Sequence, residues 1–166
     1  MNDDTLKKIQ LRIQRDGLAL HDIYMEASFE PDFPLDYKNM HYDEFCNWLS
    51  YEVKRKCHDY YVIQHNNEII GFFMTYRFRM VDGTTFLYYF IKEKLNSSDK
   101  EQLISGLVEK LFEQYPLRKI FMTSIEGRLD KEELLKRVGF HTIFSLKEHR
   151  YYRKQYLEEK IWEICS

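Results

Sequence analysis

The sequence is poor in the residues that usually mark a special scaffold. Its 166 residues include only three cysteines, three prolines and six glycines. The cysteines, Cys46, Cys57 and Cys165, form no CxxC pair, and no second set of ligands stands at zinc-site spacing. This argues against a disulfide framework and against a structural metal. An odd number of unpatterned cysteines is typical of a reducing compartment.

The sequence also lacks long apolar runs and an excess of one charge. No apolar run approaches the roughly 18 residues that a membrane-spanning helix needs. The acidic start, Met1 to Asp4, has no apolar core of the kind found in secretory signals. The formal net charge is −2, which does not suit a nucleic-acid-binding domain. We therefore expect a cytoplasmic protein that binds neither a membrane nor nucleic acid.

The composition that is present is that of an ordinary globular chain with many aromatic residues. Apolar residues make up 44% and charged residues 31% of the chain, and there are 13 tyrosines and 12 phenylalanines. Bulky rings of this kind fill a core and line a pocket. At this length we expect a single domain, residues 1–166, with a core that needs no metal or disulfide.

The first part of the chain is predicted to contain a strand and two helices. Ile9, Leu11 and Ile13 alternate with polar residues, which predicts a half-buried strand. Apolar residues recur at helical spacing from Leu18 to Tyr24 and again from Tyr42 to Lys56. We therefore expect a short helix at the first position and a longer one at the second.

Between these two helices lies a loop with acidic and aromatic residues. The segment from Phe29 to Leu35 carries two of the three prolines and is predicted to be a substrate lid. We expect the wider loop, Ala27 to Met40, to shape the acceptor pocket. Within it Asp32, Asp36 and Glu30 would suit a cationic amine.

The middle of the chain is typical of strands joined by tight turns. Tyr60–Ile63 is rich in strand formers, and Asn66-Asn67 suits a hairpin turn because asparagine tolerates a positive φ. Glu68–Met74 is the predicted returning strand. Asp82-Gly83 predicts a second turn, and Thr84–Ile91 a third strand, whose apolar second half suggests cover on both faces.

A strand–helix–strand unit follows. Ser98 and Glu101 fit a capping box, and the apolar stripe from Leu103 to Phe112 predicts a long helix. Lys119–Thr123 is a further predicted strand. Because strand, helix and strand succeed each other within one unit, Thr84–Ile91 and Lys119–Thr123 should be adjacent and parallel.

The end of the chain is predicted to hold one helix and two strands. The helix is Lys131–Val138, with Gly139 at the C′ position where a positive φ is favoured. The strands are expected at about Thr142–Tyr151 and Leu157–Cys165. The predicted fold class is therefore α+β (mixed α/β), with a mixed sheet of six or seven strands flanked by about four helices.

Three segments carry a resemblance to a known family. They are Tyr61–Gly71, which ends in NNEIIG, then Thr84–Tyr115, and Leu134–Phe140, which reads LLKRVGF. With the closing strands around Arg150-Tyr151-Tyr152, this order resembles the GNAT superfamily of CoA-dependent acyltransferases. The resemblance implies transfer of an acetyl or other acyl group from acyl-CoA to a small-molecule or peptide amine, without a metal.

In that family, backbone N–H groups at the head of the long helix bind the pyrophosphate of CoA, usually within a glycine-rich loop. A gap-free placement puts Leu95 at the usual arginine, and Asn96, Ser98 and Lys100 at the three usual glycines. Asp99 and Glu101 would repel a pyrophosphate there. The resemblance further implies that the pantetheine lies as an extra strand along Phe90 and Ile91. The implied cofactor-binding residues are Phe90, Ile91, Asn96, Ser97, Ser98, Asp99 and Lys100.

The residues that the family uses for acid chemistry are replaced. Its proton donor to the CoA thiolate is often a tyrosine at the position of Leu135, and an asparagine commonly stands at the position of Arg128. A hydrophobic side chain cannot donate a proton. Tyr151 and Tyr152 are the nearest substitutes, and each is a candidate general acid.

A general base is needed to deprotonate the amine. Glu126 is the best-placed candidate because it follows the Lys119–Thr123 strand, and sites in open α/β sheets lie at strand C-termini. Glu68 and Asp82, in turns, are further candidates. The replaced loop residues and Leu135 leave a second hypothesis open, a catalytically inactive GNAT-fold domain that binds a ligand or a protein.

Overall fold

The computed structural model describes residues 6–8, 13–35, 40–66, 68–92 and 95–166. No helix among them is long and apolar enough to cross a membrane. The elements in chain order are β1 (Leu6–Lys8), α1 (Ile13–Ala27), α2 (Tyr42–Lys56), β2 (Cys57–His65), β3 (Glu68–Arg79), β4 (Thr84–Ile91), α3 (Ser97–Gln114), β5 (Lys119–Ile125), α4 (Leu129–Val138), β6 (His141–Tyr152) and β7 (Gln155–Cys165).

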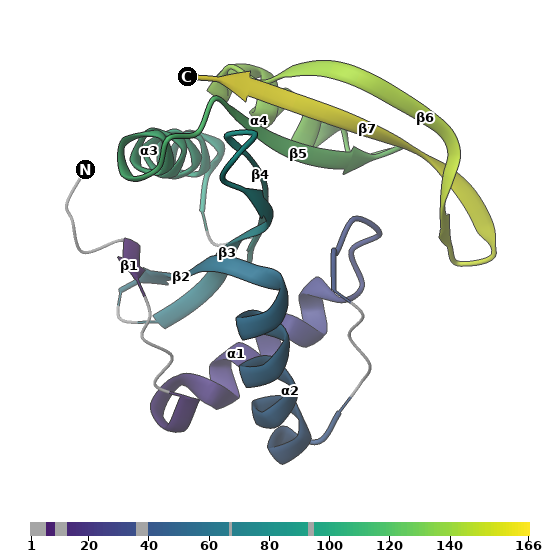
Figure 1. Cartoon of the computed structure of the whole chain (residues 1–166). Coiled ribbons are helices and arrows are strands. Elements are labelled where there is room, and N and C mark those ends of the chain that lie inside the picture. The colour runs from purple at the N-terminus through teal and green to yellow at the C-terminus, as the bar shows by residue number, and fades with distance from the viewer. Residues whose placement is uncertain (1–5, 9–12, 36–39, 67, 93–94) are drawn as a thin grey trace. The chain divides into compact units, whose positions relative to one another are not determined.

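The seven strands form one mixed sheet in the order β1-β2-β3-β4-β5-β7-β6 (Figure 1). The predicted fold class is therefore confirmed. The chain groups into two compact units, one formed by residues 1–77 and 88–94 and the other by residues 78–87 and 95–166. That a single domain spans residues 1–166 stays a prediction.

The first unit is built on an aromatic core. Its β1 and β3 both pair antiparallel with β2, and α1 and α2 pack against one face of β2 and β3 (Figure 1). Tyr24 of α1 stacks on Phe72 of β3, with ring centroids 4.5 Å apart. The buried core residues of this face are Leu20, Ile23, Tyr24, Ala27, Phe33, Leu35, Phe45, Leu49, Tyr60, Val62, Ile69, Phe72, Met74 and Tyr88.

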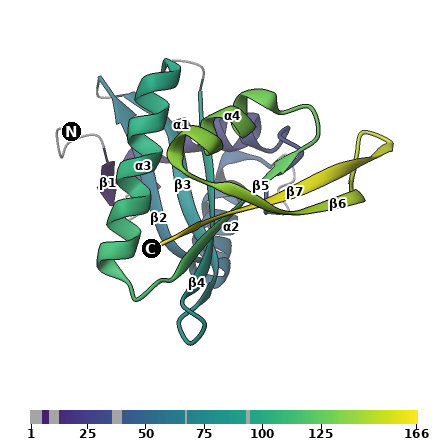
Figure 2. The same cartoon turned by 90° about the horizontal axis from the view of Figure 1, so that it is seen from above.

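The second unit contains the predicted parallel pair. Thr84 of β4 lies opposite Lys119 of β5, and Phe86 lies opposite Phe121, with the strands parallel. The connection between them contains α3, as expected for parallel strands. On its other edge β5 pairs antiparallel with β7, which pairs antiparallel with β6. Figure 2 shows the β6–β7 hairpin extending past β5 and α4.

The N-terminal prediction is corrected. Ile13 was expected to end a strand, but it begins α1, and Ile9 and Leu11 lie outside the described residues. The buried residues Leu20 and Ala27 continue the helical spacing over the whole element. The helical spacing of apolar residues from Leu18 to Tyr24 is a stronger signal than the short alternation that ends at Ile13, because a helix buries one continuous apolar face.

The loop after α1 is anchored to the core of the first unit. Phe33 and Leu35 are buried, so this part of the expected lid packs into the core. The backbone N–H of Phe33 donates to the carbonyl of Glu30 at 3.2 Å, closing a turn around Pro31 and Asp32. Proline suits the second position of such a turn because its φ is already fixed.

Gly71 of β3 lies against the backbone of the last residues of β4. A Cβ built at Gly71 would overlap the carbonyl oxygen of Phe90 and lie 3.0 Å from the Cα of Ile91. Both neighbours are backbone atoms, which cannot turn away as a side chain can. The backbone N–H of Lys92 also donates to the carbonyl of Ile70 at 2.8 Å. Glycine at position 71 therefore allows the backbone of Phe90 and Ile91 to pack directly against β3.

We expect Gly71→Ala to lower the free energy of unfolding by about 1–3 kcal/mol, because an added methyl overpacks the strand pair. Chemical denaturation measures the change. The matched control is Gly17→Ala in α1, where the new Cβ meets only the flexible end of the Tyr42 side chain and alanine favours the helix. Equal effects of the two substitutions would contradict this assignment.

Candidate functional site

The head of α3 is capped by its own side chains. Asn96 is the N-cap, and its side-chain oxygen accepts a hydrogen bond from the backbone N–H of Asp99 at 2.9 Å. Its side-chain nitrogen donates to the carboxylate of Asp99, also at 2.9 Å. Ser97 and Ser98 are the first two helical residues and are exposed. Their backbone N–H groups have no acceptor within the helix.

The predicted capping box is therefore wrong in its register. Ser98 and Glu101 were expected to form it, but the reciprocal pair is Asn96 and Asp99, two residues earlier. Glu101 instead accepts from Arg137 of α4 at 2.9 Å. Asn96 and Asp99 have the same three-residue spacing as Ser98 and Glu101, so either pair could cap a helix on sequence grounds.

The two residues expected beside the pantetheine lie at the end of β4, in the first unit. Phe90 and Ile91 are half-buried, and the ring of Phe90 stacks on that of Phe72 at 6.3 Å. The next residue, Lys92, forms an ion pair with Glu26 of α1 at 2.7 Å. The end of β4 therefore combines a half-exposed ring with a charged neighbour.

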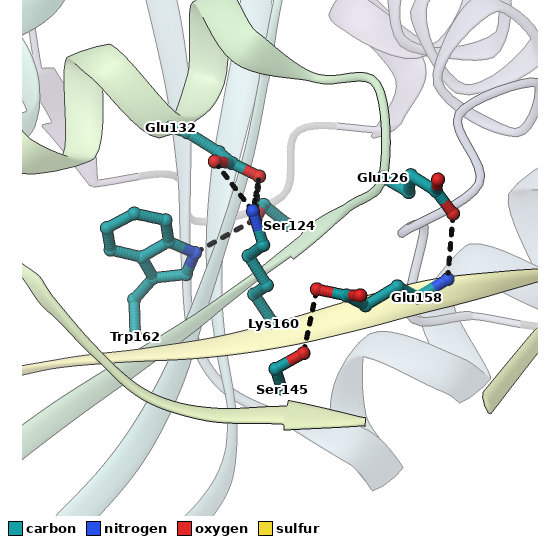
Figure 3. A network of polar contacts seen from close by, with 7 residues as sticks. All are labelled: Ser124, Glu126, Glu132, Ser145, Glu158, Lys160 and Trp162. Carbon is teal, nitrogen blue, oxygen red and sulfur yellow. Dashed lines mark hydrogen bonds and ion pairs between the residues drawn. The ribbon is translucent and has the colours of Figure 1, made fainter. Parts of the chain in front are cut away.

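Glu126, the expected base, follows β5 directly and is exposed. Its backbone N–H donates to the carbonyl of Glu158 at 2.9 Å, and its carboxylate accepts from the N–H of Glu158 at 3.4 Å. Glu158 in turn accepts from the hydroxyl of Ser145 at 2.7 Å (Figure 3). The carboxylate of Glu126 is thus held beside β7. Asp82, an alternative base, instead forms an ion pair with Arg79 at 2.7 Å.

The two candidate acids lie at the end of the β6–β7 hairpin. Tyr151 is 61% exposed, and its ring centroid is 5.0 Å from that of Tyr156. Tyr152 is half-buried, with the guanidinium of Arg153 lying 5.1 Å from its ring centroid. Tyr156 and Glu158 point to the same face of β7 because side chains alternate along a strand. Tyr151 therefore contacts Tyr156, and Glu126 contacts the backbone of Glu158, two residues further along β7. Tyr152, the next residue of β6, points to the opposite face of the sheet.

The replaced family positions have structural roles. Leu135 is fully buried, and its carbonyl accepts from the N–H of Phe140 at 2.9 Å. Gly139, with φ of 104°, ends α4 as predicted. Arg128 is the N-cap of α4 without a side-chain capping bond, and its Nε lies 3.5 Å from Asp130. Leu135 thus belongs to the core, and its side chain has no group that can donate a proton.

A buried polar network attaches α4 to β5 and β7 (Figure 3). The ammonium of Lys160 lies 2.9 and 3.0 Å from the two carboxylate oxygens of Glu132. The indole N–H of Trp162 donates to the hydroxyl of Ser124 at 2.9 Å, and that hydroxyl is 3.5 Å from Glu132. The Glu132 side chain is 8% exposed and that of Lys160 30% exposed. The pair fixes the first turn of α4 to the sheet.

Sequence reasoning missed this network. Glu132 and Lys160 are 28 residues apart, and neither stands in a recognisable motif. The alternation of β7 and its register with β5, which places Ser124 opposite Lys160, bring them together. The sequence offers one signal: Glu132 lies three residues before Leu135, so both are on the same face of the predicted helix. In the described part of the chain, no three potential metal ligands gather.

We expect Glu132→Gln to lower the free energy of unfolding by about 2 kcal/mol. Removing one partner of a fully buried pair costs roughly 3–5 kcal/mol, and the partial exposure of Lys160 reduces this. The control is Glu133→Gln, an exposed position of the same helix. Adding Lys160→Met to Glu132→Gln should restore part of the loss. A Glu132→Gln effect no larger than that of Glu133→Gln would rule out a stabilising role for the pair.

Solved structures similar to this chain are N-acetyltransferases. A spermidine N-acetyltransferase from Vibrio cholerae, in complex with CoA and spermine, is 16% identical with a TM-score of 0.82, covering 97% of this chain and 94% of its own. A ribosomal L7/L12 α-N-protein acetyltransferase in complex with CoA is 14% identical with a TM-score of 0.81, covering 97% and 94%. A ribosomal-protein-alanine N-acetyltransferase from Brucella melitensis is 14% identical with a TM-score of 0.74, covering 97% and 99%.

At these identities the structures show the fold. No curated protein sequence matches the chain significantly. The model of the acetyltransferase (GNAT) domain, however, matches residues 9–161, nearly the whole chain. The order of strands and the parallel β4–β5 pair joined through α3 agree with that match. The chain therefore belongs to the GNAT acetyltransferase domain family.

Proposed function

We propose that the protein transfers an acetyl or other acyl group from CoA to an amine. The observation that carries the proposal is the GNAT domain match over residues 9–161 together with the parallel β4–β5 pair and its connecting helix. Two of the similar structures are in complex with CoA and act on amines, a polyamine in one and a ribosomal protein in the other. For this chain we propose a small-molecule or peptide amine acceptor.

The head of α3 fits an anionic group in part. The N–H groups of Ser97 and Ser98 are available at the positive end of the helix, and Lys100 is close by in sequence. The carboxylate of Asp99 opposes a phosphate, but its hydrogen bond to Asn96 holds it in the cap. We propose that Asn96, Ser97, Ser98 and Lys100 hold the pyrophosphate, and that Asp99 weakens the binding. Phe90 and Ile91 are the proposed neighbours of the pantetheine.

The reaction forms a C–N bond to the acceptor nitrogen and breaks the thioester C–S bond, whose electron pair stays on sulfur. The proposed role of Glu126 is to take the proton that the amine loses, directly or through water. Tyr151 or Tyr152 is proposed to give a proton to the sulfur. By analogy with a cysteine thiol, whose pKa is about 8.5, the thiolate is also a tolerable leaving group. Positioning of the two substrates would then carry much of the rate.

A second candidate function is a GNAT-fold domain that binds a ligand without catalysis. The observation that favours it is the position of Leu135, which is buried in the core where the family often has a proton donor. The self-capped head of α3 points in the same direction. The three cysteines, free in the described structure, support our further proposal of a reducing, cytoplasmic compartment.

The proposed acid is tested by acetyl transfer to a panel of primary amines, followed by mass spectrometry. We expect the wild type to acetylate at least one amine, and Tyr151→Phe to lower turnover on the order of 10²-fold. Tyr151 is the first choice because its ring contacts Tyr156 of β7, two residues from Glu158, whose backbone N–H donates to Glu126. Tyr152→Phe tests the alternative acid, and Tyr51→Phe is the control, since Tyr51 is as exposed as Tyr151 but lies on α2.

If Tyr151→Phe and Tyr152→Phe both keep wild-type turnover, neither tyrosine is the acid. If the wild type binds CoA but acetylates no amine of the panel, the binding-domain function replaces the transferase.

A further inference from the structure

The turn of the β6–β7 hairpin has a backbone conformation that its residues disfavour. Tyr152 pairs with Gln155, so Arg153 and Lys154 form a two-residue loop. Their φ angles are 46° and 70°, and a positive φ at both central residues is the mark of a type I′ turn. Asparagine and glycine are the usual residues of such a turn, because other side chains are strained there. The chain thus places two cationic side chains in a turn that they destabilise.

This turn is exposed and basic. Arg153 and Lys154 are exposed, and the hairpin extends past α4 (Figure 2). Residues 147–154 include four basic residues and one acidic residue, although the formal net charge of the chain is −2. Charged residues on an edge strand such as β6 protect it from unwanted pairing. Arg153 and Lys154 lie in the turn, beyond the last strand pair, so edge protection does not account for them.

Aromatic rings stand beside the two cations. The guanidinium of Arg153 lies 5.1 Å from the ring centroid of Tyr152, a cation–π contact that holds it near the hairpin. One pair further along, Tyr151 lies opposite Tyr156, and the two residues are 61% and 63% exposed. The pair stabilises the hairpin, as cross-strand aromatic pairs do, and still leaves both rings open to solvent. Tyrosine and arginine are the residue types that most often dominate the energy of protein interfaces.

We propose that the hairpin turn, Arg153 and Lys154 with the exposed Tyr156 beside them, docks an acidic segment of another polypeptide. Complementary charge steers such a partner to the turn and selects it over neutral or basic segments. The tyrosine ring supplies apolar contact area next to the two charges. Docking requires neither CoA nor acyl transfer, so the inference goes beyond the proposed function.

The carboxylates of β7 favour a polypeptide over a nucleic acid. Glu158, on the same face as Tyr156, accepts from the hydroxyl of Ser145 at 2.7 Å. Glu159 lies 3.6 Å from His149. A nucleic-acid strand carries a negative charge at every phosphate and would bring some of these against the two glutamates. A polypeptide can space its carboxylates and place neutral residues there.

The test measures the binding of two fluorescently labelled peptides by anisotropy. One peptide alternates glutamate with alanine, and the other alternates glutamine with alanine. We expect the wild type to bind the glutamate peptide at least about fivefold more tightly, with a difference that falls as salt is added. Arg153→Asn combined with Lys154→Gly introduces the preferred turn residues. It should weaken binding of the glutamate peptide about five- to tenfold and, because it relieves the strain, raise the Tm by about 2–4 °C.

The control is Lys136→Asn combined with Arg137→Asn, which removes two positive charges from the last turn of α4 and should keep the wild-type affinity. Equal affinities of the wild type for the two peptides, or binding of neither, overturn the proposal. A hairpin variant that folds and loses no more affinity than the control also overturns it.

Two further outcomes identify the partner and separate the inference from the proposed function. Tighter binding of oligothymidylate or of phosphatidylserine vesicles than of the glutamate peptide shows a phosphate site and overturns the polypeptide proposal. If the glutamate peptide binds with the expected dependence on Arg153 and Lys154 but no amine is acetylated, the docking surface is upheld and the transferase function fails.

Discussion

Two parallel strands cannot be joined by a tight turn, and this constraint organises the chain from β4 to β5. The pair is fixed by Thr84 opposite Lys119 and Phe86 opposite Phe121, and α3 provides the long connection between them. The first turn of α3 begins at Ser97, a few residues after β4 ends at Ile91. The proposed function therefore depends on whether the backbone N–H groups of this first turn can bind the pyrophosphate of CoA.

Three acidic residues are stabilised by three different devices. Asp99 is exposed and is held by Asn96 at the positive end of a helix dipole. Glu132 is buried and is neutralised by Lys160, which anchors α4 to β7. Asp32 is buried in the proline-containing turn that the hydrogen bond from Phe33 to Glu30 closes. Of the three, Asp99 is the one that lies at the head of α3 and opposes the binding of a phosphate there.

Local periodicity was enough to predict most of the fold. The bounds of α2 and β4 were predicted to the residue, because their apolar spacing and the Asp82-Gly83 turn are strong local signals. The capping pair of α3 was misassigned by two residues, because two equivalent pairs of polar residues overlap there. The helical start of α1 was missed because three alternating residues resemble a strand.

Much less of the candidate site could be predicted. The ion pair of Glu132 depends on Lys160, which is 28 residues away in the sequence, and Asp32 is buried although it lies in a loop. Charged residues in a loop or helix are usually exposed, so no local pattern distinguishes these two. The approach of Glu126 and Tyr151 to neighbouring positions of β7 follows from strand register, which a sequence specifies only through the whole sheet.

The proposed function requires that this chain bind CoA at the head of α3. A calorimetric titration with acetyl-CoA and free CoA tests it most directly, using the wild type, Asp99→Asn and Ser98→Glu. We expect saturable binding to the wild type and binding about two- to fivefold tighter to Asp99→Asn, which loses the opposing charge but keeps a side chain able to pair with Asn96. We expect no binding to Ser98→Glu, which adds a negative charge beside the N–H groups of the first turn of α3. Absence of binding to the wild type, or equal affinity of all three proteins, would contradict it.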